Sequence, residues 1–336
     1  MPLRIGILGT ARIARSFVAG VKPSPQVLVT AVASRDAAKA RAFAQQAGLD
    51  RHFASYEALL ADRDIDAVYV PLPNSLHAEW SIRAARAGKH VLCEKPLSTT
   101  AEEARAMFEA ARRHGVHVVE AYPYRAQPQT LTMRELLNAG VIGDVQLIQA
   151  SFGFTLGGGE NIRLSPQLGG GALMDIGVYP VSLACMIAKQ RPARVHAVAD
   201  WSTSGVDRAL AATLAFASGL FAQVTCSFST CDHRQALIAG TNGVIQTTFL
   251  NHTSTPAQAV MKLRVGTGKD AVDSVVESSA VNGFLAEAES FARLVEFGPA
   301  EWSGATPEES IDIMATLQAI RESARGGGMI EVQPRS

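Results

Sequence analysis

The stretch LRIGILGTARIA, residues 3–14, joins a short apolar run to a glycine turn and then to the start of a helical pattern. Gly9, Ala11 and Ala14 occupy the three positions that the dinucleotide-binding fingerprint reserves for small residues. Ala11 is one methyl group larger than the usual glycine, but it still lets the backbone and the helix N-terminus approach a phosphate. The alternative is a glycine turn that binds no ligand. We expect a dinucleotide to contact Gly9, Thr10, Ala11, Arg12 and Ile13.

The first 120 residues continue the alternation that this stretch begins. Short apolar runs predict strands over residues 3–8, 27–33, 67–70, 90–93 and 116–119. Amphipathic runs between them predict helices over residues 11–19, 37–47, 76–87 and 101–114. Strands that alternate with helices in this way predict right-handed βαβ units and a parallel sheet covered on both faces, as in a Rossmann domain.

From about residue 124 the pattern changes. Strands follow one another with few helices between them, which favours a mainly antiparallel sheet. These strands are expected over residues 145–154, 195–201, 210–216, 220–228, 235–239, 244–249 and 261–265, and helices over 131–139, 173–188, 284–296 and 307–324. The chain is therefore predicted to be an α/β protein, with a nucleotide-binding domain at 1–123 and a substrate-binding and oligomerisation domain at 124–336.

Composition excludes several classes of protein. Of the 336 residues, 47% are hydrophobic, and 31 basic residues balance 31 acidic ones, which argues against a dedicated nucleic-acid binder. The uncharged stretch 209–231 is long enough to cross a membrane, but its period-two pattern around Ser218-Gly219 predicts a β-hairpin. The N-terminus shows no signal peptide, so we expect a cytoplasmic location. No metal site is expected, because no CxxC pair is present and His114 and His117 lack further ligands nearby.

Ser34 and Arg35 follow the second predicted strand, where an NAD enzyme usually carries an acid for the ribose hydroxyls. Arginine at this place can hold a phosphate through charge-assisted hydrogen bonds. The pattern therefore favours NADP over NAD, with NAD possible. The alternative is that Ser34 caps the next helix and Arg35 points to water.

Two further motifs follow later strands, at the edge of the sheet where open α/β proteins bind ligands. The first comprises Pro71, Leu72, Pro73, Asn74 and His77. Asn74 is suited to cap the following helix whatever the function, and a histidine in a first helical turn is more often packed or exposed than functional.

The second motif is Cys93-Glu94-Lys95-Pro96. A Glu-Lys pair is usually a solvated ion pair, but the proline biases the preceding residue to an extended conformation, and the Lys95–Pro96 bond can be cis or trans. Lys95 is then aimed from the sheet edge toward a ligand.

Taken in this order, the motifs resemble the glucose-fructose oxidoreductase / inositol dehydrogenase (Gfo/Idh/MocA) family over essentially the whole chain. The resemblance also rests on Glu120-Ala-Tyr122, on Tyr124-Arg125 and on the stretch from Asp175 to Pro180. It is strongest to the branch of dimeric dihydrodiol dehydrogenases and xylose-type aldose dehydrogenases, which commonly carry tyrosine at the position of Tyr179. Inositol dehydrogenases typically place histidine there, so inositol is disfavoured as substrate.

The resemblance implies roles for three residues. Lys95 matches the catalytic lysine, Tyr179 the proton-transfer residue and Asp175 an acid of the substrate site. Glu94 and His77 would join the cofactor site. Helical spacing would place Asp175 and Tyr179 on one face. Without the resemblance, Asp175 reads as a charge at a helix start and Tyr179 as core packing.

The expected reaction is hydride transfer between nicotinamide and a carbinol carbon of a sugar, polyol or related diol, with NADP(H) preferred. Two alternatives stay open: NAD-dependent glycoside hydrolysis, as in a minority of the family, and a nucleotide-sensing protein without turnover. The second sheet is expected to leave one face uncovered, with Val198, Leu214, Phe216 or Phe228 on it. Such a face predicts a homodimer or a higher homo-oligomer.

Overall fold

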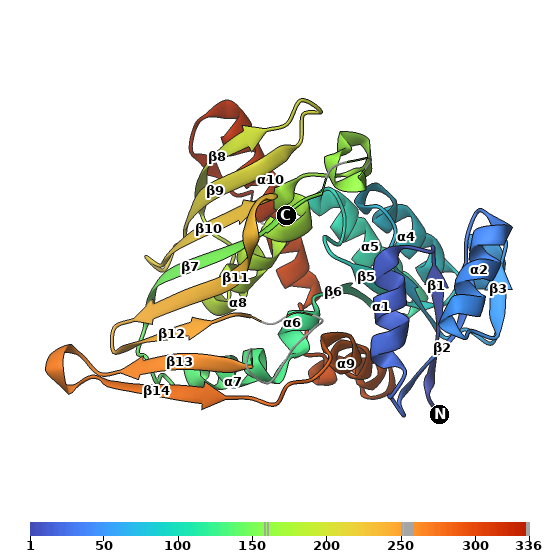
Figure 1. The fold of residues 1–336 in the computed structure, drawn as a ribbon, viewed down its shortest axis with the longest axis horizontal. Coiled ribbons are helices and arrows are strands. Elements are labelled where there is room, and N and C mark those ends of the chain that lie inside the picture. Colours follow the sequence, from blue (N-terminus) through green and yellow to red (C-terminus); the bar gives the residue numbers. More distant parts are fainter. Residues whose placement is uncertain (158, 160, 250, 252–258, 334–336) are drawn as a thin grey trace. The chain divides into compact units, whose positions relative to one another are not determined.

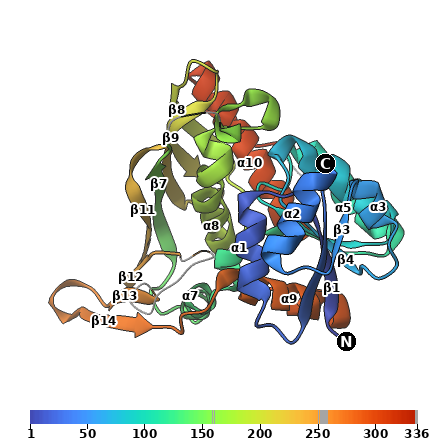
Figure 2. The same ribbon diagram turned by 45° about the vertical axis from the view of Figure 1, so that its right-hand side comes forward.

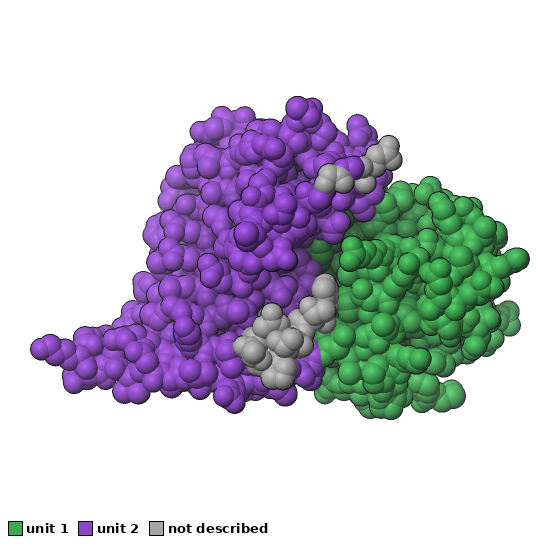
Figure 3. All heavy atoms as spheres, viewed as in Figure 1, with its two compact units in different colours: residues 1–126, 282–307 green, residues 127–281, 308–336 purple. Residues whose placement is uncertain are grey.

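The structure is a computed structural model that describes every residue except 158, 160, 250, 252–258 and 334–336 (Figure 1). Contacts between residues divide it into two compact units, coloured separately in Figure 3. Unit 1 comprises residues 1–126 and 282–307, and unit 2 comprises residues 127–281 and 308–336. The domain boundary after residue 123 stays a prediction, and the structure adds that residues 282–307 pack with the first unit.

Unit 1 is built on a six-stranded sheet with the strand order β3-β2-β1-β4-β5-β6. Every pairing between its described strands is parallel, which confirms the predicted Rossmann sheet. Its strands are β1 (Leu3–Leu8), β2 (Val27–Ala33), β3 (Arg51–Phe53), β4 (Ala67–Val70), β5 (His90–Glu94) and β6 (Val118–Ala121). The strand order reverses beside β1, so the ends of β1, β2 and β4 meet at the point where such sheets bind nucleotides.

Helices cover both faces of this sheet (Figures 1 and 2). They are α1 (Arg12–Val21), α2 (Ala37–Ala47), α3 (Tyr56–Leu60), α4 (His77–Arg86), α5 (Ala101–His114), α6 (Pro123–Ala126) and α9 (Gly283–Phe297). Side chains of α1, α2 and α9 share one apolar cluster with Ile5, Ile7 and Tyr69. Val68, Val70 and Val91 are fully buried outside that cluster, and α4 packs on their strands, β4 and β5.

Local pattern located most of unit 1. The predicted ranges of β1, β2, β4, α2 and α5 coincide with the observed ones, whereas β6 begins two residues later than expected. The sequence interpretation missed β3 and α3, because three strand residues and five helical residues are too short to show a period.

Unit 2 contains a nine-stranded sheet of order β14-β13-β12-β11-β7-β10-β9-β8-β15 in the described part of the chain. Its strands are β7 (Val145–Thr155), β8 (Arg194–Trp201), β9 (Asp207–Ala215), β10 (Phe221–Ser227), β11 (Ser229–Gly240), β12 (Gly243–Thr247), β13 (Val260–Val265), β14 (Val272–Glu277) and β15 (Ile330–Glu331). The sheet is mainly antiparallel, as predicted, and among these strands β7 and β10 pair in parallel. The short β15 and the exposed β14 were not predicted.

Three helices belong to unit 2: α7 (Pro128–Asn138), α8 (Val178–Ala188) and α10 (Pro307–Gly326), which enters the unit at Glu308. A π-helical turn, η4 (Leu173–Gly177), precedes α8. The helix α8 packs on β7 and β10, and a serine of α10 accepts a hydrogen bond from β8, so both lie on one face of the sheet (Figure 2).

The uncharged stretch 209–231 forms antiparallel strands β9 and β10, which confirms the predicted hairpin. By length and composition alone, one helical stretch among the described residues, Pro166–Ala188, could cross a membrane. However, 83% of its most apolar window is buried inside the protein, as in the core helix of a folded domain.

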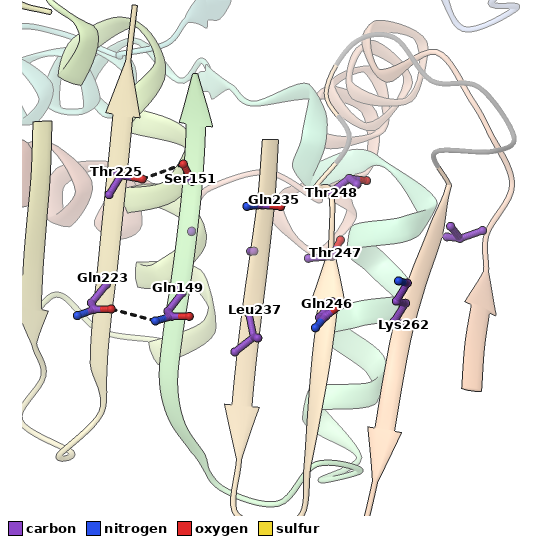
Figure 4. Close-up of a pocket in the computed structure, with 13 residues that line it drawn as sticks. Gln149, Ser151, Gln223, Thr225, Gln235, Leu237, Gln246, Thr247, Thr248 and Lys262 are labelled. Atoms are coloured by element: carbon purple, nitrogen blue, oxygen red, sulfur yellow. Dashed lines mark hydrogen bonds between the residues drawn. The ribbon is translucent and has the colours of Figure 1, made fainter. Parts of the chain in front are cut away.

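The uncovered face of the unit 2 sheet differs from the expected one. Leu214, Phe216 and Phe228 are at most 5% exposed, whereas Val198 is 61% exposed. Only Val198 of the four expected residues is therefore exposed, because strand alternation turns the others into the core. Figure 4 shows amide and hydroxyl side chains along this face, where Gln149 bonds Gln223 and Thr225 bonds Ser151.

Candidate active site

The glycine turn after β1 is fixed by its surroundings. Gly9 has a φ of 106°, and its N–H donates to the carbonyl of Ala33 at 2.8 Å. The backbone angle requires glycine, and a Cβ at Gly9 would lie 2.9 Å from the tip of the Leu72 side chain, which would have to shift. Leu72 belongs to the second predicted motif, so the structure brings the β1 and β4 strand ends together.

The first turn of α1 suits a phosphate. Ala11 is the N-cap and has an extended backbone, and no side chain caps the helix. The first turn contains no acidic residue, and Arg12 there is exposed. The N–H groups at the start of a helix bind anions when no side chain already accepts from them. These residues therefore fit the pyrophosphate of a dinucleotide.

The three polar residues that follow β2, Ser34, Arg35 and Asp36, have different roles. Asp36 caps α2, accepting from Ala38 at 2.9 Å and from Lys39 at 3.1 Å. Ser34 is buried and accepts from the Asp36 N–H, so it supports the cap instead of providing it. Arg35 is exposed, and its charge and hydrogen bond partly oppose the rise in Tyr56 pKa that burial causes.

This arrangement fits NADP. Because Asp36 is committed to the helix, it does not provide the free acid that recognises ribose hydroxyls in NAD enzymes. The exposed Arg35 provides a cation at the same strand end, where a 2′-phosphate would lie.

His77 connects two of the predicted motifs. Its ring is fully buried, and its nitrogens lie 2.7 Å from the Leu72 carbonyl and 2.8 Å from the Pro96 carbonyl. Burial lowers the pKa of His77, so the ring is favoured as neutral and donates to one of these carbonyls at a time. His77 therefore holds the Leu72 and Pro96 segments together, and a direct contact with the cofactor stays a prediction.

Glu94 and Lys95 end the buried strand β5. The Tyr69 hydroxyl donates to Glu94 at 2.6 Å, and the Lys95 N–H donates to the other carboxylate oxygen at 3.2 Å. Phe17 stacks on Tyr69, with ring centres 4.0 Å apart. The peptide bond between Lys95 and Pro96 is cis. The end of β5, the Tyr69 hydrogen bond and Pro96 therefore hold the backbone at Lys95 in place. The Lys95 side chain itself is partly exposed.

Sequence interpretation missed Glu287, a second carboxyl in this region. Glu287 lies on α9, is 1% exposed, and neither carboxyl oxygen has a hydrogen-bond partner among the described residues. Burial and the neighbouring charge of Glu94 raise the pKa of Glu287 well above its usual value. The sequence could have indicated Glu287, because it lies on the same apolar face of the helix as Phe284 and Phe291, where an apolar residue is expected.

In unit 2, Asp175 is held by a partner that the sequence did not reveal. Arg163 donates to Asp175 at 2.5 Å. Asp175 lies in the π-helical turn η4, whereas Tyr179 lies in α8. The regular four-residue spacing therefore does not apply across the junction, and a shared face stays a prediction.

The turn that carries Asp175 is anchored by Asp207. Its carboxylate accepts from the Leu173 N–H at 2.6 Å, at the first residue of η4. The preceding Gly171 has a φ of 118°, and a Cβ there would lie 2.2 Å from an Asp207 oxygen. Burial raises the pKa of Asp207, opposed by the hydrogen bond from Leu173. Asp207 thus fixes where η4 begins.

Tyr179 is 5% exposed, and its hydroxyl accepts from Asn251 at 2.9 Å. Gln127 donates to the carbonyl of Asn251 and so holds that residue in place. The Phe152 ring lies 5.4 Å from the Tyr179 ring. Asn251 is 72 residues from Tyr179 in the chain, and no local pattern pointed to it.

A concavity of about 590 Å³ lies on the uncovered face of the unit 2 sheet (Figure 4). Gln149 and Ser151 line it, whereas Phe152, the next residue of β7, alternates toward α8 and Tyr179. This concavity is therefore separate from the candidate residues of unit 2. No group of three metal-ligating side chains occurs in the described part of the chain.

Two family models match the chain. Residues 3–122 match an oxidoreductase family with an NAD-binding Rossmann fold (GFO_IDH_MocA), and residues 130–246 match a GFO/IDH/MocA C-terminal domain. A D-xylose 1-dehydrogenase (NADP(+)) from Haloferax volcanii is 38% identical, covering 98% of this chain and all of that protein. A trans-1,2-dihydrobenzene-1,2-diol dehydrogenase from Danio rerio is 37% identical over 73% of this chain and 74% of its own length.

Solved structures agree with these matches. A 3-ketoreductase from Actinomadura kijaniata, in complex with NADP and TDP-benzene, superimposes with a TM-score of 0.83 at 33% identity. The alignment covers 96% of this chain and 98% of that one. An aldose-aldose oxidoreductase from Caulobacter crescentus gives a TM-score of 0.88 at 26% identity, covering 98% of this chain and 100% of that one.

Proposed function

This chain belongs to the GFO/IDH/MocA family of oxidoreductases, and we propose that it transfers a hydride reversibly between NADP(H) and a carbinol carbon of a sugar, polyol or related diol. The observation that carries the proposal is the 38% identity with an NADP-dependent xylose dehydrogenase over 98% of the chain. That similarity spans the glycine turn, the Glu94-Lys95-Pro96 segment and Tyr179 together.

Several features of unit 1 support a preference for NADP(H). The uncapped start of α1 would bind the pyrophosphate, and Arg35 would bind the 2′-phosphate while Asp36 caps α2. Pro71 to Asn74 and Glu94 lie at neighbouring strand ends and would hold the rest of the cofactor. When bound, the nicotinamide supplies or accepts the hydride.

Three residues are proposed to act on the substrate. Tyr179 exchanges the proton of the reacting hydroxyl, Lys95 bonds the same oxygen, and Asp175 binds a neighbouring hydroxyl. Tyrosine has an ordinary pKa of about 10, so a nearby cation is needed to raise its phenolate fraction at neutral pH. Asn251 donates to the Tyr179 oxygen and would stabilise the phenolate in the same sense.

Purified protein with NADP⁺ and a panel of aldoses, polyols, trans-diols, sugar acids and sugar phosphates tests the proposal. NADPH formation at 340 nm is expected with at least one member and more slowly with NAD⁺. Reduction of the matching aldonolactone or ketone by NADPH should also occur. Tight NADPH binding without turnover on the whole panel would contradict the proposed reaction.

We also propose that the protein acts in the cytoplasm as a homodimer or larger homo-oligomer. The uncovered face of the unit 2 sheet supports the assembly, through Val198, Phe221 and the amide side chains beside them. Light scattering at micromolar concentration should give at least twice the monomer mass of 35.6 kDa.

A further inference from the structure

Arg234 occupies an unusual place in unit 2. It lies on β11, where Ala236 and Ile238 follow it at period two and are at most 4% exposed. Alternation therefore turns Arg234 toward the same side as these core residues. A partly buried guanidinium therefore stands beside two apolar core residues in the same row.

The surroundings of Arg234 lead to Tyr179. Its guanidinium carbon lies 5.3 Å from the centre of the Phe152 ring, which packs 5.4 Å from the Tyr179 ring. Its Nε donates to the Thr248 carbonyl at 3.3 Å. Burial lowers the pKa of Arg234, and the charge of Tyr179 acts in the opposite direction. Arg234 is thus a cation close to the proposed proton-transfer residue.

Three other arginines of unit 2 each pair with a carboxylate. Arg163 pairs with Asp175, Arg208 with Asp200, and Arg264 with Asp273. Among the described residues, no carboxylate lies within 4.0 Å of Arg234, and its one hydrogen bond to them uses Nε. The terminal N–H groups, which form the fork that binds carboxylates and phosphates in pairs of hydrogen bonds, make no hydrogen bond to the described residues.

A partly buried charge that meets no counter-charge among the described residues is stabilised by a ligand that supplies one. We propose that Arg234 binds an anionic group of the substrate, a carboxylate or a phosphate, beside the carbon that reacts at Tyr179. This inference rests on the proposed function, since it assigns the substrate class of the same site. The substrate is then a sugar acid or a phosphorylated sugar rather than a neutral sugar.

Calorimetric titration of the NADPH-loaded protein tests this without requiring turnover. D-Glucose, D-glucuronate and D-glucose 6-phosphate serve as the neutral, carboxylate and phosphate probes. At least one anion should bind about 10- to 100-fold more tightly than glucose, as a charge-assisted hydrogen bond predicts. The stronger of the two anions identifies the source of the charge.

The variant Arg234→Gln should remove this preference and leave glucose binding within about twofold. Arg208→Gln, at an exposed arginine on β9 of the same sheet, is the matched control and should keep the preference. If Arg234→Gln does not fold, Arg234→Lys should keep a weaker preference, because it retains the charge without the fork. Equal binding of all three probes by the wild type, or an unchanged preference in Arg234→Gln, would overturn the inference.

The proposed reaction is judged separately, by turnover on the panel with NADP⁺. If the protein prefers the anions but turns over none of the panel, the role of Arg234 is supported and the oxidoreductase proposal is contradicted. Turnover that is equally efficient with neutral and anionic sugars would support the oxidoreductase proposal and overturn the role of Arg234.

Discussion

The two units place their candidate residues by different means. In unit 1, Gly9, Arg35 and Lys95 follow the carboxyl ends of parallel strands, so the sheet places them close together. In unit 2, Tyr179 and Asp175 depend on residues far along the chain, since Asn251 bonds Tyr179 and Arg163 bonds Asp175. A local motif can therefore identify candidate cofactor residues, whereas the candidate substrate residues are positioned by contacts far along the chain.

The two units also differ in how each holds a buried acid, Asp207 in unit 2 and Glu287 in unit 1. In unit 2, Asp207 accepts a backbone hydrogen bond, and the charges of Arg321 and Arg325 favour its ionised form. In unit 1, Glu287 has no hydrogen-bond partner among the described residues and lies near the like charge of Glu94. The first acid has a supporting structural role, whereas the second is expected to be protonated.

The largest expected effect separates the chemistry of unit 2 from the cofactor binding of unit 1. Tyr179→Phe keeps the ring but removes the proton carrier, so kcat should fall by about 10²–10⁴. NADPH affinity, measured by fluorescence titration, should stay within about twofold. Lys95→Met should lower kcat at least as much. Turnover by Tyr179→Phe within a few-fold of wild type would show that another residue transfers the proton.

Arg35→Ala tests the cofactor side alone. Loss of a charge-assisted phosphate contact should weaken NADPH binding by about 1.5–3 kcal/mol and leave NADH binding nearly unchanged. The exposed Arg41→Ala on α2 is the control and should change neither affinity. Equal affinities of the wild-type protein for NADPH and NADH would contradict the role given to Arg35.

Asp207→Ala tests the anchor of η4. The variant leaves the Leu173 N–H buried without its acceptor, which should lower the free energy of unfolding by about 1–3 kcal/mol. Because η4 carries Asp175, kcat/KM should fall as well. Asp207→Asn retains an acceptor oxygen and should recover most of both losses. Asp200→Ala, which removes an exposed ion pair with Arg208, should cost less than about 1 kcal/mol. Equal losses in both alanine variants would contradict the anchoring role.

Glu287→Gln gives the smallest effect at neutral pH but a distinct dependence on pH. The pKa of Glu287 is raised in the folded protein, so folding retains a proton that the unfolded chain releases above pH about 4.3. The stabilising contribution is complete below that pH and is lost as pH rises toward the folded pKa, by about 1.4 kcal/mol per pH unit. Urea unfolding between pH 5 and pH 8 should show this loss in the wild type.

Glu287→Gln should remove that part of the slope, whereas Glu296→Gln, an exposed position on α9, should retain it. Parallel stability curves for the wild type and Glu287→Gln across this range would mean that Glu287 is not protonated in the fold.

The comparison also explains what the sequence could predict. Gly9 and the βαβ pattern determine local structure, so the parallel sheet and the ends of β1, β2 and β4 followed from them. Asn251 was not predictable, because nothing near it in the chain indicates that it bonds Tyr179. The π-helical turn at 173–177 was missed for a related reason: its apolar pattern resembles that of an α-helix, and Asp207, 34 residues away, fixes its start.

Two charges were visible in the sequence but not interpreted. Glu287 stands in the helical stripe of Phe284 and Phe291, and Arg234 stands at period two with Ala236 and Ile238. A charged residue at a core position indicates either a partner or a function. The sheet pairings were needed to decide which side Arg234 faces, because a shift of one residue would turn it to solvent.

The central claim is hydride transfer from a carbinol carbon to the nicotinamide, and isotope transfer tests it most directly. A panel substrate deuterated at the reacting carbon is incubated with NADP⁺ and wild-type protein, and the reduced cofactor is analysed by NMR and mass spectrometry. The account predicts NADPH carrying one deuterium at C4. Reduced cofactor without deuterium, or consumption of the sugar without cofactor reduction, would contradict it.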